Sequence, residues 1–198
     1  MPTTIDLPDG DAPVVRYAYK ASLIGTAQQF ELTDAGLSWR VSGRSDVWPY
    51  VRISSIRLSY RPMSMQAHRF RADIEDADGA RIVLLSTSWQ TVTLMAPQDS
   101  GYRAFMTQLH QRMKAAGSGA ALIGGIGPKT YAAGMLLLAL VTVSITGLFV
   151  RAIATGEFTA ALFLVGFAAL FGWQIGGWVR RNRPRAYAFD DLPKELLP

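Results

Sequence analysis

The sequence predicts a mixed protein in two parts: an N-terminal antiparallel β-barrel capped by one C-terminal α-helix, followed by a two-helix transmembrane hairpin. Three observations predict this fold class. Apolar and polar residues alternate with a period of two through much of the first hundred residues, which is typical of half-buried strands. One amphipathic stripe with helical spacing follows, and two long runs without charge come after it.

The composition excludes several classes of protein. Of the 198 residues, 18% are charged and 49% are hydrophobic, whereas soluble proteins carry roughly 25% charged residues. This balance excludes a disordered chain and disfavours a purely soluble one. The chain has no cysteine and two histidines, which excludes disulfides, thiolate chemistry and a histidine-rich metal cluster. Because the sequence shows no nucleophile–base or metal-ligand constellation, we expect no metal, no cofactor and no enzymatic activity.

The predicted barrel domain covers residues 14–115. Its clearest features are two hairpins, whose strands are joined by turn residues at 33–36 and 76–79. The acidic, proline-containing residues 1–13 before it predict a disordered lead-in. The segments that alternate as strands do are 14–21, 30–32, 37–41, 56–60, 69–75 and 81–85.

A change of period marks the helix that is expected to cap the barrel. Asp99 or Ser100 is the expected N-cap, and apolar residues then recur every three or four positions. This stripe consists of Tyr102, Phe105, Met106, Leu109 and Met113. The small residues that follow predict a Gly/Ala linker over 116–129.

The order of these elements, strands first and a single helix last, resembles the pleckstrin-homology-like (PH-like) barrel. Residues 30–60 carry the resemblance, with a strand, a Thr-Asp-Ala-Gly turn, a second strand and then Trp-Pro-Tyr-Val-Arg-Ile. The chain looks like the bacterial membrane-associated branch of this superfamily, whose members combine such barrels with short transmembrane hairpins. The resemblance implies a protein–protein platform. It does not imply phosphoinositide recognition, because Lys20 is the only basic residue around the first hairpin loop.

The two runs without charge are long enough to cross a membrane. The predicted spans are 130–150, with 21 residues, and 158–179, with 22 residues. At about 1.5 Å per residue each helix is roughly 32 Å long, against a hydrocarbon core of about 30 Å. The short segment 151–157 between them predicts an external turn, so the two spans form a hairpin.

Basic residues decide the expected orientation, because cytoplasmic flanks of membrane spans carry an excess of lysine and arginine. The 151–157 turn holds one such residue, Arg151, and more lie before the first span and after the second. We therefore expect a multi-pass protein of the cytoplasmic (inner) membrane, with both termini and the tail 180–198 in the cytoplasm. The residues expected at the cytoplasmic interface, where the arginines attract anionic lipid headgroups, are Tyr131, Trp173, Trp178, Arg180, Arg181, Arg183 and Arg185.

Small residues in the second span predict a helix-packing surface. Ala168, Gly172 and Gly176 recur every four residues, a spacing that lets another helix approach closely. The alternative is that these glycines are only tolerated in a membrane helix. The groove could receive the first span, a second copy of the chain or another membrane protein.

Other motifs have simple structural interpretations. The segment 124–130 lacks the Gly-Lys pair of a phosphate loop, because Pro128 intervenes. His68 has no aspartate or serine nearby in the chain to orient it as a base, and His110 flanks the apolar stripe. Residues 1–128 carry 13 basic and 11 acidic residues, a net charge of +2, so nucleic-acid binding is not expected. A cation site is not expected at Asp73, Glu75, Asp76 and Asp78. Asp73 and Glu75 share the solvent face of a strand with Arg69 and Arg71, which suggests cross-strand charge pairing.

The sequence therefore predicts a non-enzymatic, membrane-anchored adaptor or accessory protein that presents its barrel at the cytoplasmic face to a protein partner. The alternative is a structural subunit of a larger integral-membrane complex. In that case the hairpin docks on another membrane protein or on a second copy.

Overall fold

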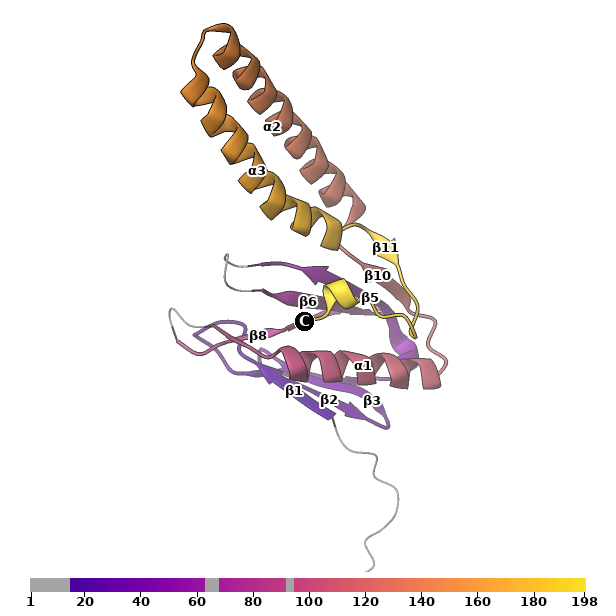
Figure 1. Cartoon of the computed structure of the whole chain (residues 1–198). Coiled ribbons are helices and arrows are strands. Elements are labelled where there is room, and N and C mark those ends of the chain that lie inside the picture. The colour runs from indigo at the N-terminus through magenta and orange to yellow at the C-terminus, as the bar shows by residue number, and fades with distance from the viewer. Residues whose placement is uncertain (1–14, 63–67, 92–94) are drawn as a thin grey trace, which may run out of the picture.

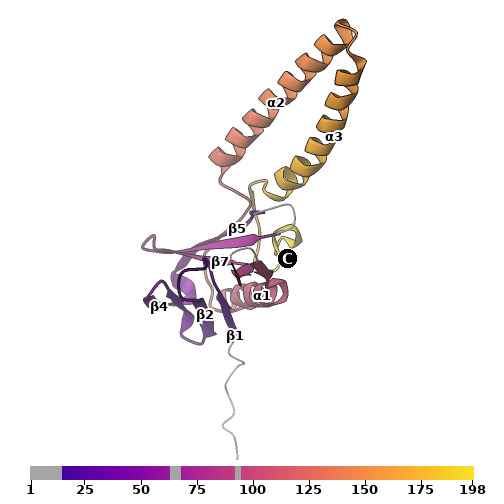
Figure 2. The same cartoon turned by 90° about the vertical axis from the view of Figure 1, so that its left-hand side faces the viewer.

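The computed structural model describes residues 15–62, 68–91 and 95–198, so the expected lead-in 1–13 lies outside the described residues. Antiparallel strands and one helix form a β-domain, and two long helices rise from one side of it (Figures 1 and 2). The second of two main sheets lies between these long helices and the helix α1 of the β-domain (Figures 1 and 2).

The first sheet is an antiparallel meander of four strands. Its strands are β1 (Val15–Tyr19), β2 (Gln28–Thr33), β3 (Gly36–Val41) and β4 (Arg44–Trp48), in that order. The β2–β3 turn needs a glycine, because Gly36 has a φ of +143° and a Cβ atom there would lie 2.2 Å from the backbone oxygen of Trp48.

The second sheet has five strands in the order β11-β10-β5-β6-β7. Its centre is the antiparallel run β5 (Ile53–Tyr60), β6 (Phe70–Asp76) and β7 (Arg81–Leu85). A two-stranded sheet follows, made of β8 (Thr87–Trp89) and β9 (Met95–Pro97), which the sequence did not predict.

The hydrophobic core lies between the two main sheets and α1 (Asp99–Ala115). All five residues of the predicted helical stripe are fully buried there. The hydroxyl groups of Tyr17 and Tyr19 on β1 reach across and donate hydrogen bonds to the carbonyls of Leu85 (2.5 Å) and Val83 (2.6 Å) on β7. Side-chain hydrogen bonds therefore bridge β1 and β7, while the backbone ladders form separate sheets.

Two segments that the sequence assigned to a linker and a tail belong to the second sheet. Within 116–129, β10 (Ala121–Gly124) pairs in parallel with β5. Within 180–198, β11 (Arg185–Ala186) pairs with β10, and a 3-10 turn (Lys194–Leu196) packs on the core. The small residues of 116–129 suggest a linker. The strand β10 was not predicted, because it is short and its partner β5 lies more than sixty residues away in the chain.

The long helices are α2 (Pro128–Ala154) and α3 (Phe158–Arg181), and both are long and apolar enough to cross a membrane. Helix α2 continues through Arg151, because the following Ala-Ile-Ala favours helix. The turn between the helices is therefore shorter than the predicted 151–157 and covers 155–157.

The two helices touch along a seam of partly buried residues. On both helices these residues recur mainly at three- and four-residue spacing, which is typical of left-handed helix pairs. They are Tyr131, Gly134, Leu138, Val141, Ile145, Phe149 and Ala152 on α2, and Ala161, Leu164, Phe171, Ile175 and Trp178 on α3. Near the junction Gly177, Val179 and Arg181 of α3 are partly buried as well.

Candidate functional site

The hairpin joins the β-domain through a tightly built junction. Only three residues separate the end of β10 from the start of α2. Within them the N–H of Gly125 donates to the carbonyl of Leu58 on β5 (2.8 Å), and the N–H of Ile126 donates to the carbonyl of Asn182 (3.1 Å). A Cβ atom on Gly125, whose φ is +86°, would lie 2.5 Å from the carbonyl oxygens of Asn182 and Arg183. The junction therefore admits only glycine at this position.

Asn182 directly follows α3 and attaches that helix to β5, the strand that Gly125 also contacts. Its side chain is fully buried. The side-chain amide donates to the carbonyl of Tyr60 (2.9 Å), and its oxygen accepts the N–H of Tyr60 (3.1 Å). The side chain thus pairs with the last residue of β5 as a neighbouring peptide group would. The guanidinium of Arg181 lies 4.8 Å above the ring of Tyr60 and adds a cation–π contact.

The tail after the junction folds back over the β-domain. The N–H of Tyr187 donates to the carbonyl of Leu122 on β10 (3.1 Å), and Leu196 is fully buried in the core. An ion pair between Lys114 and Asp190 (2.7 Å) ties the tail to α1. The tail therefore packs on the β-domain.

His110 is the polar centre of the contact between α1 and the tail. It is fully buried, its Nδ1–H donates to the carbonyl of Met106 (2.7 Å), and its Nε2 lies 3.0 Å from the hydroxyl of Tyr187. The ring also packs against Phe189. Burial lowers the pKa of His110, so the neutral form is favoured and Nε2 accepts the tyrosine hydrogen bond. This environment makes His110 a packed structural residue.

The other histidine contacts the junction from its far side. The Nδ1 atom of His68 lies 2.6 Å from the hydroxyl of Tyr60, whose backbone Asn182 holds. The sequence did not predict this contact, because Tyr60 ends β5 and His68 lies beyond that strand in the chain.

The outer face of the second sheet is charged, and its charges are sorted along the strands. Ile56 and Leu58 fill the core, so Arg57 and Ser59 lie on the outer face, away from α1 and toward the hairpin. In register, Arg57 faces Asp73 and Ser59 faces Arg71. The residues at the junction end of this surface, which we call the basic face, are Arg57, Ser59, Arg61, Arg69 and Arg71.

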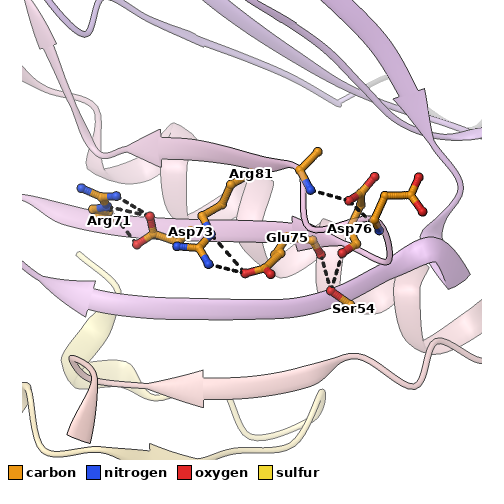
Figure 3. A network of polar contacts seen from close by, with 8 residues as sticks. Ser54, Arg71, Asp73, Glu75, Asp76 and Arg81 are labelled. Carbon is orange, nitrogen blue, oxygen red and sulfur yellow. Dashed lines mark hydrogen bonds and ion pairs between the residues drawn. The ribbon is translucent and has the colours of Figure 1, made fainter. Parts of the chain in front are cut away.

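At the edge of the basic face and beyond it, the acidic residues of this sheet already have partners. Arg81 pairs with Glu75 across β6 and β7 (2.7 Å), and Arg71 pairs with Asp73 of its own strand (Figure 3). The buried carboxylate of Asp76 accepts the N–H groups of Asp78 (3.0 Å) and Ala80 (2.8 Å) in the β6–β7 turn (Figure 3).

These contacts agree in part with the charge pairing that the sequence predicted. The partner of Glu75 is Arg81 across the strands, but Asp73 pairs along its own strand instead of across to a neighbour. Among the described residues there is no group of three or more histidine, aspartate or glutamate side chains that could hold a metal ion.

The predicted helix-packing residues lie outside the α2–α3 contact. Ala168, Gly172 and Gly176 are exposed, and a Cβ atom on either glycine would meet no atom within 4 Å. The two glycines lie one position beyond the seam residues Phe171 and Ile175. The stripe therefore does not receive the first long helix.

The residues predicted at the membrane interface have different surroundings in the structure. Trp173 is 82% exposed on α3. Trp178 packs against the hydrophobic core of the β-domain and lies beside Gly134 of α2. Tyr131 is half-buried in the seam. The four predicted arginines lie at the end of α3 and just after it: Arg180, Arg181, Arg183 and Arg185.

Comparison of the chain with protein-family models, curated proteins and solved structures finds no match.

Proposed function

We propose that this chain is a non-enzymatic membrane adaptor, in which α2 and α3 span the cytoplasmic membrane and hold a PH-like domain against its inner leaflet. The domain presents a binding surface to a protein partner. The order of elements supports the PH-like proposal, with four meandering strands, three more strands in a second sheet and then one helix.

The junction is the observation that carries this proposal. A simple tether would need only a flexible linker, yet Gly125, Asn182 and Leu196 all fix the hairpin base to β5 and the core. Such a connection holds the β-domain in one orientation relative to the two long helices. A fixed orientation is useful to a protein that must present one surface to a partner at the bilayer.

The charge distribution supports the proposed topology. Lys129 and the arginines after α3 lie at the base of the hairpin, whereas Arg151 is the basic residue near its tip. A reporter that is active only outside the cytoplasm should be silent when fused after Pro198 and active when inserted at Gly156. Activity after Pro198 would overturn the orientation.

Co-purification in mild detergent, followed by mass spectrometry, tests whether the β-domain recruits the partner. Phe105→Asp places a charge at a fully buried position and should unfold the β-domain. We expect this variant to remain in the membrane fraction and to lose the partner. Retention of the partner by the Phe105→Asp variant would overturn the adaptor proposal.

A structural subunit of a larger membrane complex is the second candidate. It is favoured by one observation, the exposure of Gly172 and Gly176 outside the α2–α3 seam. If the hairpin is the docking element, Gly172→Leu with Gly176→Leu should release the partner, because the larger side chains block close helix approach. If the adaptor proposal is correct, this double variant keeps the partner.

A further inference from the structure

We infer that the basic face binds the phosphate group of an anionic phospholipid in the inner leaflet. This inference rests on the proposed function in one respect: the long helices must lie in the membrane with their base at the cytoplasmic side. It goes beyond the topological role of the arginines after α3, because it assigns a lipid site to residues of the β-domain.

The charge at the basic face is unbalanced within the described residues. Arg57, Arg61, Arg69 and Arg71 lie on neighbouring positions of β5, β6 and their ends, and Asp73 is the one carboxylate among them. Asp73 is already engaged, because Nε of Arg71 donates to both of its oxygens (3.0 and 2.9 Å). The other three arginines form no ion pair with the described residues.

Two hydrogen-bond donors on this face lack an acceptor in the described part of the chain. One Nη atom of Arg57 and the hydroxyl of Ser59 are both buried without a partner, two residues apart on the same side of β5. Buried donors of this kind normally find a partner, and each one left unpaired is unfavourable. A lipid phosphate outside the sheet does not reach these two buried atoms directly, so it would be held by the exposed guanidinium of Arg61 and the half-buried ones of Arg57 and Arg69, which donate hydrogen bonds to phosphate oxygens.

The arginines also repel one another. Burial lowers the pKa of Arg69, and the neighbouring guanidinium groups of Arg71 and Arg61 lower it further. An anion bound among these side chains would reduce this repulsion.

The junction places the basic face at the depth of lipid headgroups. The 27 residues of α2 measure about 40 Å, which exceeds the hydrocarbon core of about 30 Å and reaches into the headgroup layers. Only Gly125–Gly127 separates α2 from the sheet that bears the basic face. The second sheet turns one face toward the hairpin (Figures 1 and 2). With α2 and α3 in the membrane, the arginines on that face would lie toward the inner leaflet.

Native mass spectrometry of the full chain in a neutral detergent tests the inference. The chain is titrated with phosphatidylglycerol, with phosphatidylcholine and, in a separate arm, with inorganic phosphate. The test variant is Arg57→Gln with Arg69→Gln. The matched control is Arg16→Gln with Arg40→Gln, which removes the same charge from the first sheet, on the side of the β-domain away from the hairpin (Figure 1).

We expect the native chain and the control to retain phosphatidylglycerol in preference to phosphatidylcholine. The test variant should bind phosphatidylglycerol about tenfold more weakly or worse, since two cations near the headgroup are lost. Equal retention by test and control variants would overturn the inference. So would equal occupancy by inorganic phosphate at the same concentration, which would make the site one for free phosphate.

Two further measurements keep the result interpretable. If Arg57→Gln lowers the melting temperature in the absence of lipid, the test variant becomes Arg61→Gln with Arg69→Gln. Arg61 is exposed, so its substitution should leave the fold intact. The reporter fusions described above test the topology without reference to lipid binding. If the reporters contradict the topology, the proposed function fails, whatever the lipid titration shows. If the topology holds and the chain does not prefer phosphatidylglycerol, only this inference fails.

Discussion

The base of the hairpin and the seam between its helices are held together by different kinds of contact. At the base, directional hydrogen bonds from Gly125 and Asn182 meet the backbone of a single strand, β5. Along the seam, apolar side chains and small residues touch at regular spacing, and most of the helix surface is exposed. Directional bonds fix an orientation, whereas apolar contact along a seam tolerates small changes in angle and register.

This difference indicates where the protein is rigid. The hairpin is attached to the β-domain more specifically than its helices are attached to each other. A substitution at the base should therefore alter the position of the β-domain, whereas a substitution on the outer surface of the hairpin should alter only what the hairpin meets.

The largest effect is expected from Gly125→Val. A valine at a φ of +86° is strained, and its Cβ would overlap two carbonyl oxygens at 2.5 Å. We expect a loss of more than about 3 kcal/mol from the free energy of unfolding, measured by thermal melting in detergent. Gly147→Val in the middle of α2 is the matched control, since its Cβ would meet nothing within 4 Å. Equal melting of the two variants would show that the junction is not tight.

Asn182→Ala should have the next largest effect. It leaves the N–H and carbonyl of Tyr60 without their partners in a buried place, which costs about 2 to 4 kcal/mol. Asn182→Asp keeps the shape and the acceptor but opposes an oxygen to the Tyr60 carbonyl, so it should destabilise at least as much. A fully stable aspartate variant would mean that packing, not hydrogen bonding, fixes the end of α3.

A smaller effect is expected at low pH through His110. Its pKa is lowered in the folded state by burial, so the unfolded chain binds the proton more tightly. Stability should therefore be complete above the unfolded value of about 6.5 and fall as the pH drops below it. Thermal melting between pH 7 and pH 5 should show this loss in the native chain.

The His110→Gln variant is the control for this titration. The variant cannot take up a proton, so its melting temperature should change less over the same interval. An identical pH dependence of the two chains would assign the loss to other groups.

The sequence predicted well those features that depend on local periodicity. The stripe from Tyr102 to Met113 and the two long apolar helices follow from the spacing of apolar residues, and the β2–β3 turn follows from Thr33–Gly36. Each of these signals lies within a few residues of the element that it predicts.

The junction could not be predicted in the same way. β10 pairs in parallel with β5 more than sixty residues away, and Asn182 pairs with a backbone 122 residues away. An asparagine after a helix is an ordinary sign of a helix end, so nothing local distinguished Asn182. A signal was present in Gly124–Gly125 followed by Ile126, where two glycines before a long apolar helix suggest a close backbone approach as well as a linker.

The smallest effect on stability is expected from Gly172→Leu with Gly176→Leu. Both side chains would project from α3 beside the seam into space that no other described atom occupies, so the melting temperature should be almost unchanged, within about 0.5 kcal/mol. Gly134→Leu is the contrasting control, because a Cβ there lies 3.9 Å from the ring of Trp178 and a leucine would wedge the two helices apart at their base. If the double leucine variant melts as low as Gly134→Leu, the glycines contribute to the hairpin itself and the outward stripe has no separate role. If it melts like the native chain, any change in co-purifying partner or self-association belongs to a surface of α3 that the hairpin leaves free for another helix.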